Sequence, residues 1–235
     1  MTDTGKSQKS DLNEHLKTSI LTMQLRPGHD LDEAELSKAF GLSRTPLREV
    51  FRDLAGEGYV ELRAKRGCRV SEMSHTTLRD FFQAAPMIYG AVLQLAALNA
   101  TASQIETLKQ AQNEFRDALR TGSAATRTLA NNRFHEITGE MAGNVYLLPS
   151  FKRLLIDHAR IGMTVYQPQN NEMAENLTTA SDQHDAIIAV IETRNAEEAG
   201  RLADEHWRLS RDQIEMFVMP TALDLALGTF PQSSA

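Results

Sequence analysis

The stretch that decides the fold runs from Phe40 to Gly58 and reads Phe-Gly-Leu-Ser-Arg-Thr-Pro-Leu-Arg-Glu-Val-Phe-Arg-Asp-Leu-Ala-Gly-Glu-Gly. Gly41 stands where a preceding helix must end, and Ser43 can cap the next helix by accepting a bond from an unpaired backbone N–H. Pro46 falls in the first turn of that helix, where its missing N–H costs little. The stretch therefore predicts the second half of a helix-turn-helix, with a helix that begins at about Arg44.

The predicted helix has two different faces. One is an apolar stripe at positions i, i+3, i+4 and i+7, made of Leu47, Val50, Phe51 and Leu54. The adjoining face carries a positive charge every four residues, at Arg44, Arg48 and Arg52, with Thr45 beside them. A basic face of this kind also occurs on helices that only meet solvent, so the helix alone leaves both interpretations open.

The residues after Gly58 favour DNA binding. They read as strand, turn and strand, in the order Tyr59-Val60-Glu61-Leu62-Arg63, Ala64-Lys65-Arg66-Gly67 and Cys68-Arg69-Val70. This pattern predicts a short β-hairpin with a basic tip, which is a wing. A helix suited to the major groove beside a basic wing holds a duplex at two points, where phosphates give affinity and base edges give sequence choice.

Composition and charge are compatible with this interpretation once they are divided by region. The chain has 235 residues, 41% hydrophobic and 24% charged, which is enough for two modest cores. Its net charge of -6 arises entirely after residue 75, because residues 1–75 hold 12 basic and 12 acidic side chains. Within residues 44–70, basic side chains exceed acidic ones by seven to four. This weak basic footprint predicts DNA binding that fades quickly as salt is added.

The sequence has neither a cysteine pair nor an uninterrupted apolar run of membrane-spanning length, and both features bear on the cellular compartment. Cys68 is the single cysteine, so an internal disulfide is excluded, and we expect it to be a small half-buried wing residue without chemistry. We find no apolar run near the ~18 residues of a membrane span and no apolar signal-peptide core at the N-terminus. We expect a cytoplasmic protein that has no membrane partner.

We predict a mainly α fold of two domains. Residues 1–9 are expected to be a disordered tail, 10–72 a winged helix-turn-helix domain, 76–225 a helical domain and 226–235 a second tail. Helical periodicity after residue 76 predicts an antiparallel bundle of six or seven helices, and Pro86 is expected to kink or divide the first of them.

Histidines on apolar faces are the informative residues of this second domain. His184 lies among isoleucines, His206 shares a face with leucines, and His135 stacks with Asn131 at i, i+4. A buried imidazole needs a partner, so these rings are either separately hydrogen-bonded in the core or jointly bound to a metal ion. His158 also faces inward and Arg160 follows it closely. These two are candidates for lining an effector pocket, the alternatives being a core histidine and a surface arginine.

The N-terminal residues resemble the GntR superfamily of bacterial transcription regulators. The likeness is carried by Leu25-Arg26-Pro27-Gly28, Leu31-Asp32-Glu33-Ala34-Glu35-Leu36, Gly41-Leu42-Ser43-Arg44-Thr45-Pro46-Leu47-Arg48-Glu49, Leu54 with Glu57-Gly58, and Arg66-Gly67-Cys68-Arg69-Val70. The resemblance implies that Arg44, Thr45 and Arg48 meet bases and phosphates, and that the wing at Lys65, Arg66 and Gly67 approaches the minor groove. Ala34 stands where many members carry a basic DNA-contacting residue.

The second domain resembles the effector-binding (FCD) domain of the FadR branch of that superfamily. Relatives carry Asp-x-x-x-His followed by two further histidines, and often hold a metal there; here the matching residues are Asn131, His135, His184 and His206. The resemblance implies a divalent ion such as Zn or Ni, bound more weakly because Asn131 replaces the aspartate. Ala85 and Tyr89 replace an arginine and a glutamate that many relatives carry in the first helix of the domain.

The sequence therefore predicts a ligand-responsive transcription regulator, a repressor, that binds a palindromic operator as a homodimer. Its effector is expected to be an organic acid bound beside the metal. A metal sensor and a three-histidine metalloenzyme are the alternatives. Against an enzyme, the sequence has no His-Glu-x-x-His pair, no Gly-x-Ser-x-Gly elbow and no phosphate loop.

Overall fold

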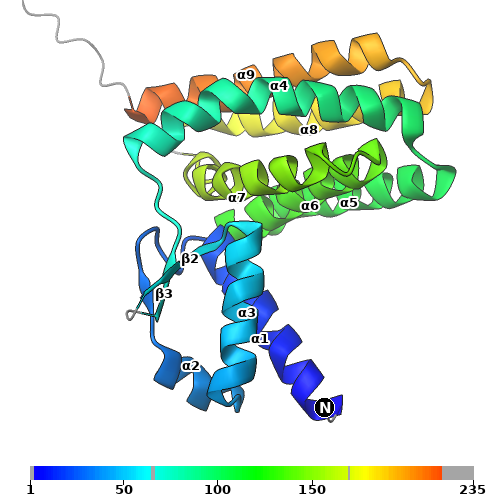
Figure 1. Ribbon diagram of the computed structural model, residues 1–235. Coiled ribbons are helices and arrows are strands. Elements are labelled where there is room, and N and C mark those ends of the chain that lie inside the picture. The colour runs from blue at the N-terminus through cyan, green and yellow to red at the C-terminus, as the bar shows by residue number, and fades with distance from the viewer. Residues whose placement is uncertain (1–2, 65–66, 169, 219–235) are drawn as a thin grey trace, which may run out of the picture.

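The chain folds into a small winged domain that lies against one side of a helical bundle (Figure 1). The computed structural model describes residues 3–64, 67–168 and 170–218. The winged domain consists of α1 (Asp3–Leu21), β1 (Asp30–Leu31), α2 (Glu33–Phe40), α3 (Arg44–Glu57), β2 (Val60–Arg63) and β3 (Gly67–Val70). The bundle consists of α4 (His75–Asn99), α5 (Ala102–Thr121), α6 (Ala124–Ala142), α7 (Leu147–Val165), α8 (Asn171–Glu192) and α9 (Ala196–Val218). The predicted fold class is confirmed.

Helix α3 forms where the sequence places it. Gly41 ends α2 in the left-handed region, at φ 63°, and Gly58 ends α3 in the same region, at φ 93°. Both positions favour glycine because a Cβ is strained there. Ser43 is the residue before α3, but its side chain makes no capping bond, so the expected cap is wrong in this detail. The apolar stripe of α3 is buried as predicted, at Leu47, Val50, Phe51 and Leu54.

The wing is part of a three-stranded antiparallel sheet in the order β1-β3-β2. The register pairs Leu62 with Cys68, and β1 extends the sheet by pairing Leu31 with the same cysteine. Cys68 is fully buried, and thus more deeply than the half-buried position expected of it, because β1 and β2 both pair with its strand. Lys65 and Arg66, the predicted basic tip, lie outside the described residues.

The two expected tails have different outcomes. Helix α1 begins at Asp3, so the prediction of a disordered segment over residues 1–9 is wrong for residues 3–9. Ion pairs from α1 to α3 account for the difference, since Lys9 binds Glu49 at 2.7 Å and Lys17 binds Glu57 at 2.6 Å. The expected boundary at 225 and the tail 226–235 lie outside the described residues.

Six helices of the described chain form the bundle, within the predicted six or seven. Helices α4, α8 and α9 form one layer and α5, α6 and α7 the other (Figure 1). Helix α4 passes through Pro86 as one continuous helix and is not divided. It is also long and apolar enough by composition to cross a membrane, which the sequence analysis missed, but it packs against α6, α7, α8 and α9 as a core helix of the bundle.

The winged domain is docked on α7. Ile156 and Ala159 of α7 are buried within the same apolar cluster as the core of the winged domain. The short connection between the domains runs from Ser71, itself only 4% exposed, to the start of α4. Helix α7 therefore belongs to the cores of both domains.

Candidate functional sites: a basic helix face and a histidine cavity

The recognition face of α3 is exposed. Arg44, Thr45 and Arg48 all lie on the surface, and Arg48 is held by Glu33 of α2 at 3.2 Å. A groove of about 530 Å³ separates α3 from the wing and is lined by Leu31, Glu33, Arg48, Phe51, Arg52, Leu62, Arg63 and Gly67. The structure thus brings Arg48 and Gly67 to one groove, whereas Arg44 and Thr45 are exposed on α3 outside its lining.

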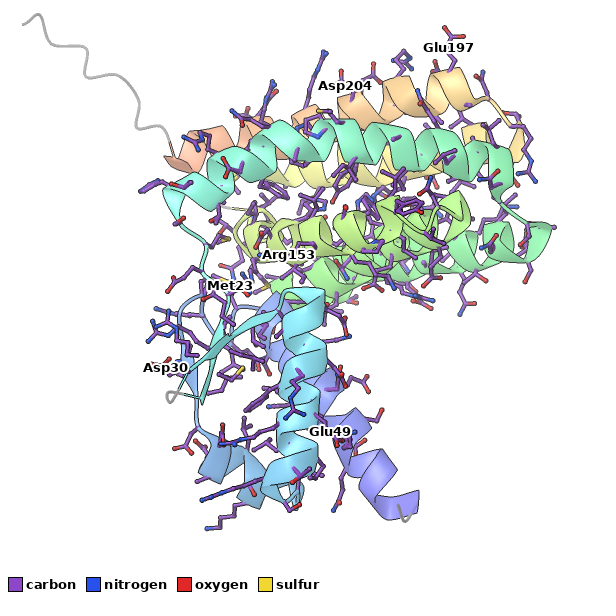
Figure 2. The ribbon with its side chains drawn as sticks, in the orientation of Figure 1. Met23, Asp30, Glu49, Arg153, Glu197 and Asp204 are labelled. Atoms are coloured by element: carbon purple, nitrogen blue, oxygen red, sulfur yellow. The ribbon has the colours of Figure 1, made fainter. Side chains whose placement is uncertain are left out.

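Two other acidic side chains of the winged domain, which do not line this groove, are paired with basic residues. Glu49 of α3, labelled in Figure 2, turns to Lys9 of α1. Asp30 near the wing, also labelled, receives two hydrogen bonds from Arg69, at 2.5 and 2.7 Å. These pairs leave the basic side of α3 as the positive surface of a domain whose net charge is small.

Three of the predicted metal ligands meet inside the bundle. His135 of α6, His184 of α8 and His206 of α9 are each at most 5% exposed. One ring nitrogen from each lies within 4.8 Å of the other two. Three helices therefore each contribute one imidazole to a single small volume.

Gln112 of α5 orients His184. The Gln112 amide nitrogen donates to the Ser181 carbonyl oxygen at 2.8 Å, so the amide oxygen faces His184 and accepts a bond from Nδ1–H at 3.0 Å. The His184 Nε2 must then carry a lone pair. Phe134 stacks on the ring at 3.7 Å and fixes its plane.

Gln183 has the same position relative to His206. Its amide oxygen lies 2.8 Å from His206 Nδ1, which leaves Nε2 as the free nitrogen when Nδ1 is the donor. Carbonyl or carboxylate partners on the far nitrogen are the usual way in which proteins aim histidine ligands at a metal. Two of the three imidazoles are therefore prepared as ligands.

The donor set fits a divalent ion. In the described part of the chain, His135 Nε2, His184 Nε2 and Asn131 Oδ1 are buried and have no hydrogen-bond partner. Buried polar atoms without partners are rare, and an ion would satisfy all three. Burial also lowers the pKa of His206 to about 3 and the pKa of His135 and His184 well below 6.5, so the rings are neutral at pH 7. Asn131 supplies an oxygen without charge, so the site lacks the anion that stabilises a dication.

His158 extends this cluster through a tyrosine. The His158 Nδ1 lies 2.7 Å from the Tyr89 hydroxyl, and its ring stands 5.2 Å from that of His135. Burial lowers the pKa of His158 to about 4 and raises that of Tyr89 well above 10, so both groups are neutral. Tyr89, Gln112 and Gln183 were not recognised from the sequence, because no local pattern shows contacts between residues up to 72 positions apart.

Arg160 is placed differently from the sequence interpretation, which put it beside His158 in an effector pocket. It lies on the other side of α7, because two residues along a helix turn the side chain through about 200°. Its guanidinium donates to the Ser71 carbonyl oxygen between the two domains. It is also 1% exposed, so it is not a surface arginine.

Comparison with known families decides the classification. Residues 8–70 match the model described as bacterial regulatory proteins, gntR family, and residues 80–209 match the FCD domain. The chain belongs to the GntR family, in the branch with an FCD domain. It is 22% identical over 185 residues to YdhC of Bacillus subtilis (strain 168), an HTH-type transcriptional regulator, covering 78% of this chain and 80% of that protein. It is 31% identical over 127 residues to the HTH-type transcriptional repressor RspR of Escherichia coli (strain K12), covering 54% and 56% of the two chains.

A solved structure has the same fold. McbR/YncC of E. coli superposes with a TM-score of 0.75 over 93% of this chain and all of the other, at 16% identity. At this identity the likeness concerns the fold alone. The relatives are transcription regulators, so this GntR-family protein is a DNA-binding regulator and not an enzyme, and the metalloenzyme alternative is wrong.

Proposed function

We propose that this GntR-family regulator is a cytoplasmic repressor that binds a palindromic operator as a homodimer and responds to a small anionic ligand held with a divalent metal in its histidine cavity. Arg44, Thr45 and Arg48 read the major groove, and Lys65, Arg66 and Gly67 approach the minor groove. A dimer is expected because one winged domain offers too few base contacts for a unique operator, and two-fold symmetry doubles them.

One observation carries the ligand part of the proposal. The imidazoles of three helices converge within 4.8 Å, while two of their nitrogens and the Asn131 oxygen have no partner among the described residues. Histidines that served only the core would have partners for both ring nitrogens, whereas Nε2 of His135 and of His184 has none among the described residues. A cluster with its free nitrogens turned inward is better explained by an ion between them.

A small hollow of about 20 Å³ adjoins the histidine cluster at His206 and is also lined by Val165, Tyr166, Asn176, Leu177, Ala180 and Leu209. It has room for one water-sized group. An organic effector that entered here would have to move these side chains, which is the kind of change that a regulatory domain uses.

The same observation favours a second candidate, a metal sensor in which the ion alone is the signal. The two candidates differ in what a second ligand adds. A metal sensor changes operator affinity with metal alone, whereas an effector domain responds most to metal and acid together.

The test begins with selection of operator sequences by the purified full chain and its mass by light scattering with and without DNA. Operator affinity is then titrated with Zn²⁺, with Ni²⁺ and with each metal plus small carboxylates. His184→Ala should lose the ligand response and keep its DNA affinity, while Arg44→Ala should do the reverse. Selection of no palindrome, or a normal ligand response in His184→Ala, contradicts the proposal.

A further inference from the structure

Helix α7 adjoins the histidine cluster through His158 on one face and contacts the winged domain with the other. His158 points from it to Tyr89, next to His135. Arg160, two residues later, points to the linker at Ser71. A helix moves largely as a rigid element, so displacement of one face displaces the other.

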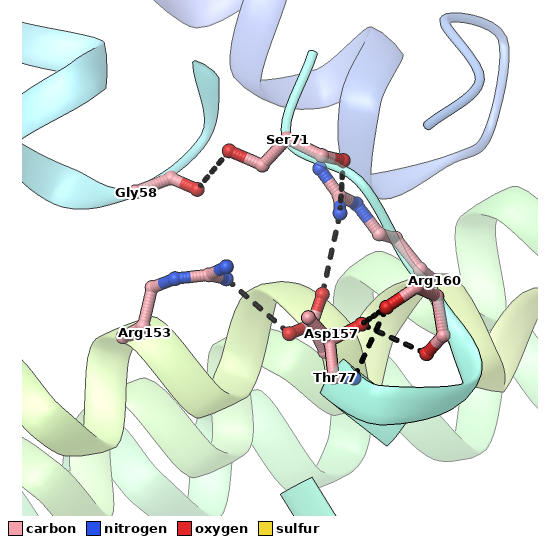
Figure 3. Close-up of polar contacts among 7 residues, drawn as sticks. Gly58, Ser71, Thr77, Arg153, Asp157 and Arg160 are labelled. Atoms are coloured by element: carbon pink, nitrogen blue, oxygen red, sulfur yellow. Dashed lines mark hydrogen bonds and ion pairs between the residues drawn. The ribbon is translucent and has the colours of Figure 1, made fainter. Parts of the chain in front are cut away.

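A closed ring of contacts joins α7 to the end of the recognition helix (Figure 3). Arg160 Nη1 donates to the Ser71 carbonyl oxygen at 3.1 Å and to Asp157 Oδ1 at 3.2 Å. Ser71 Oγ in turn donates to the carbonyl oxygen of Gly58, the residue that ends α3, at 2.8 Å. Arg153 Nη1 donates to the other Asp157 oxygen at 3.3 Å, and its side chain packs so closely on Gly58 that a Cβ there would clash.

Holding the two domains together through this ring requires buried charges to give up their hydration. The Arg160 side chain is fully buried, and its Nε and Nη2 have no partner among the described residues. Burial lowers the pKa of Arg160 and raises that of Asp157, because the charged form of each loses its hydration. Apolar residues of similar size would dock the domains at least as firmly. What the charged ring adds is a single geometry, because its bonds end on particular carbonyl oxygens.

We propose that Arg160, Asp157 and Ser71 form a latch that sets the angle at which the helical domain presents α3 to DNA, and that a ligand in the histidine cavity acts on DNA binding by shifting α7 beneath this latch. The second clause rests on the proposed function. A groove of about 470 Å³ lies beside the latch, lined among others by Gly58, Tyr59 and Arg153. It leaves room on this side for the winged domain to change its angle, with Ile156 and Ala159 of α7 as the apolar contact about which it would turn.

The latch predicts a dependence on the distance between operator half-sites. One added base pair moves the second half-site by about 3.4 Å and turns it by about 34°. A dimer whose two α3 helices are held at a fixed angle should therefore bind one spacing with roughly tenfold higher affinity than the others. The variant Asp157→Leu/Arg160→Met removes both charges together and avoids a lone buried ion. It should reduce the preference to about threefold or less while binding a single half-site as the wild type does.

Two further variants separate a positioning role from a merely structural one. Asp117→Leu/Arg120→Met removes an ion pair of the same spacing from the exposed surface of α5, and it should keep the wild-type preference. Ser71→Ala removes only the bond to Gly58 and should give an intermediate preference. A merely structural latch would lower the melting temperature and leave the preferred spacing unchanged, and that result refutes the positioning role.

A titration with Zn²⁺ tests the coupling. Zn²⁺ should raise the melting temperature of both the wild type and the double variant, but it should change operator affinity only in the wild type. An equal change of affinity in both proteins, or no change in a wild type that Zn²⁺ stabilises, refutes coupling through α7. If Zn²⁺ stabilises neither protein, the metal part of the proposed function fails, and coupling through a metal-bearing cavity fails with it.

The spacing measurement then still decides whether the latch positions α3. A wild type that binds all spacings equally refutes the dimeric operator and the latch together. A preference that the double variant keeps refutes the latch alone.

Discussion

Asn131→Asp should lower the free energy of unfolding of the metal-free protein and raise the affinity of the protein for a metal ion. Asn131 is 5% exposed, and its Oδ1 has no hydrogen-bond partner among the described residues. A carboxylate there has no counter-ion without metal, so it folds in its protonated form. Protonating an aspartate at pH 7 costs about 4 kcal/mol, which is the upper limit of the destabilisation in EDTA.

Metal reverses this effect. A charged oxygen in place of a neutral one should tighten Zn²⁺ binding by about 10- to 100-fold, which adds about 1.4–2.7 kcal/mol of stabilisation when Zn²⁺ is in excess. For a chain of this size, the Zn²⁺-induced rise in melting temperature should exceed that of the wild type by about 3–11 °C. Differential scanning fluorimetry with Zn²⁺ and with EDTA measures both effects.

Asn132→Asp is the matched control. Asn132 is the next residue of α6, is 6% exposed and also has a partnerless Oδ1, but it bonds Glu136 and lines the groove between the domains. Asn132→Asp should destabilise the protein in EDTA, and its gain in stability from Zn²⁺ should equal that of the wild type. If both variants respond to Zn²⁺ as the wild type does, the histidine cavity holds no metal through Asn131, and the reasoning is refuted.

Three further outcomes are expected. Glu33→Gln frees Arg48 from its exposed ion pair and should tighten operator binding by up to about fivefold. Arg48→Ala should weaken the free energy of operator binding by about 1–3 kcal/mol. Fluorescence anisotropy measures both affinities, and equal values for the wild type and both variants would show that Arg48 does not contact DNA. In the unfolded chain a histidine binds a proton with a pKa of about 6.5. In the folded chain without metal, burial lowers the pKa of His158 to about 4 and that of His206 to about 3, so these rings stay neutral to lower pH. Urea denaturation should therefore show stability falling by about 1.4 kcal/mol per pH unit for each ring below pH 6.5, and His158→Gln should remove one such contribution; a flat profile would contradict the buried neutral rings. Gly58→Ala should destabilise the protein by about 1–3 kcal/mol, because a Cβ at φ 93° is strained and would clash with Arg153, and an unchanged melting temperature would refute the close docking of α3 on α7.

The winged domain could be predicted from the sequence because its signals are local. Gly41 and Pro46 mark the start of a helix, and Gly67 begins the second strand of the wing directly after the turn, all within a few residues of the structure that they determine. The helical start of the chain could not be predicted, because its polar sequence is stabilised by Lys9 and Lys17, which bind acids forty residues away. Ion pairs between helices leave no periodic signal in the sequence of either helix.

The histidine cavity was predictable only in part, for the same reason. Periodicity turns His135, His184 and His206 inward, and this needs no knowledge of their neighbours. The hydrogen bonds that orient them come from Gln112 and Gln183, whose amides look like ordinary surface side chains in the sequence. For Arg160, helical periodicity already predicts that its side chain points away from that of His158. Its burial could not be predicted, because it depends on the contact with Ser71 in the other domain.

The charge balance of the cavity indicates what class of molecule completes it. Three neutral imidazoles, with the buried Asn131 oxygen proposed as a fourth ligand, offer a dication no negative charge. A buried dication with neutral ligands keeps its full charge, so it is bound weakly until an anion joins it. An anionic effector then gains the attraction of the metal, while the metal gains the missing charge, and each binds more tightly because of the other. With the neutral Asn131 as the fourth ligand, occupancy of the proposed site would depend on the effector, which is the property that a signal receptor requires.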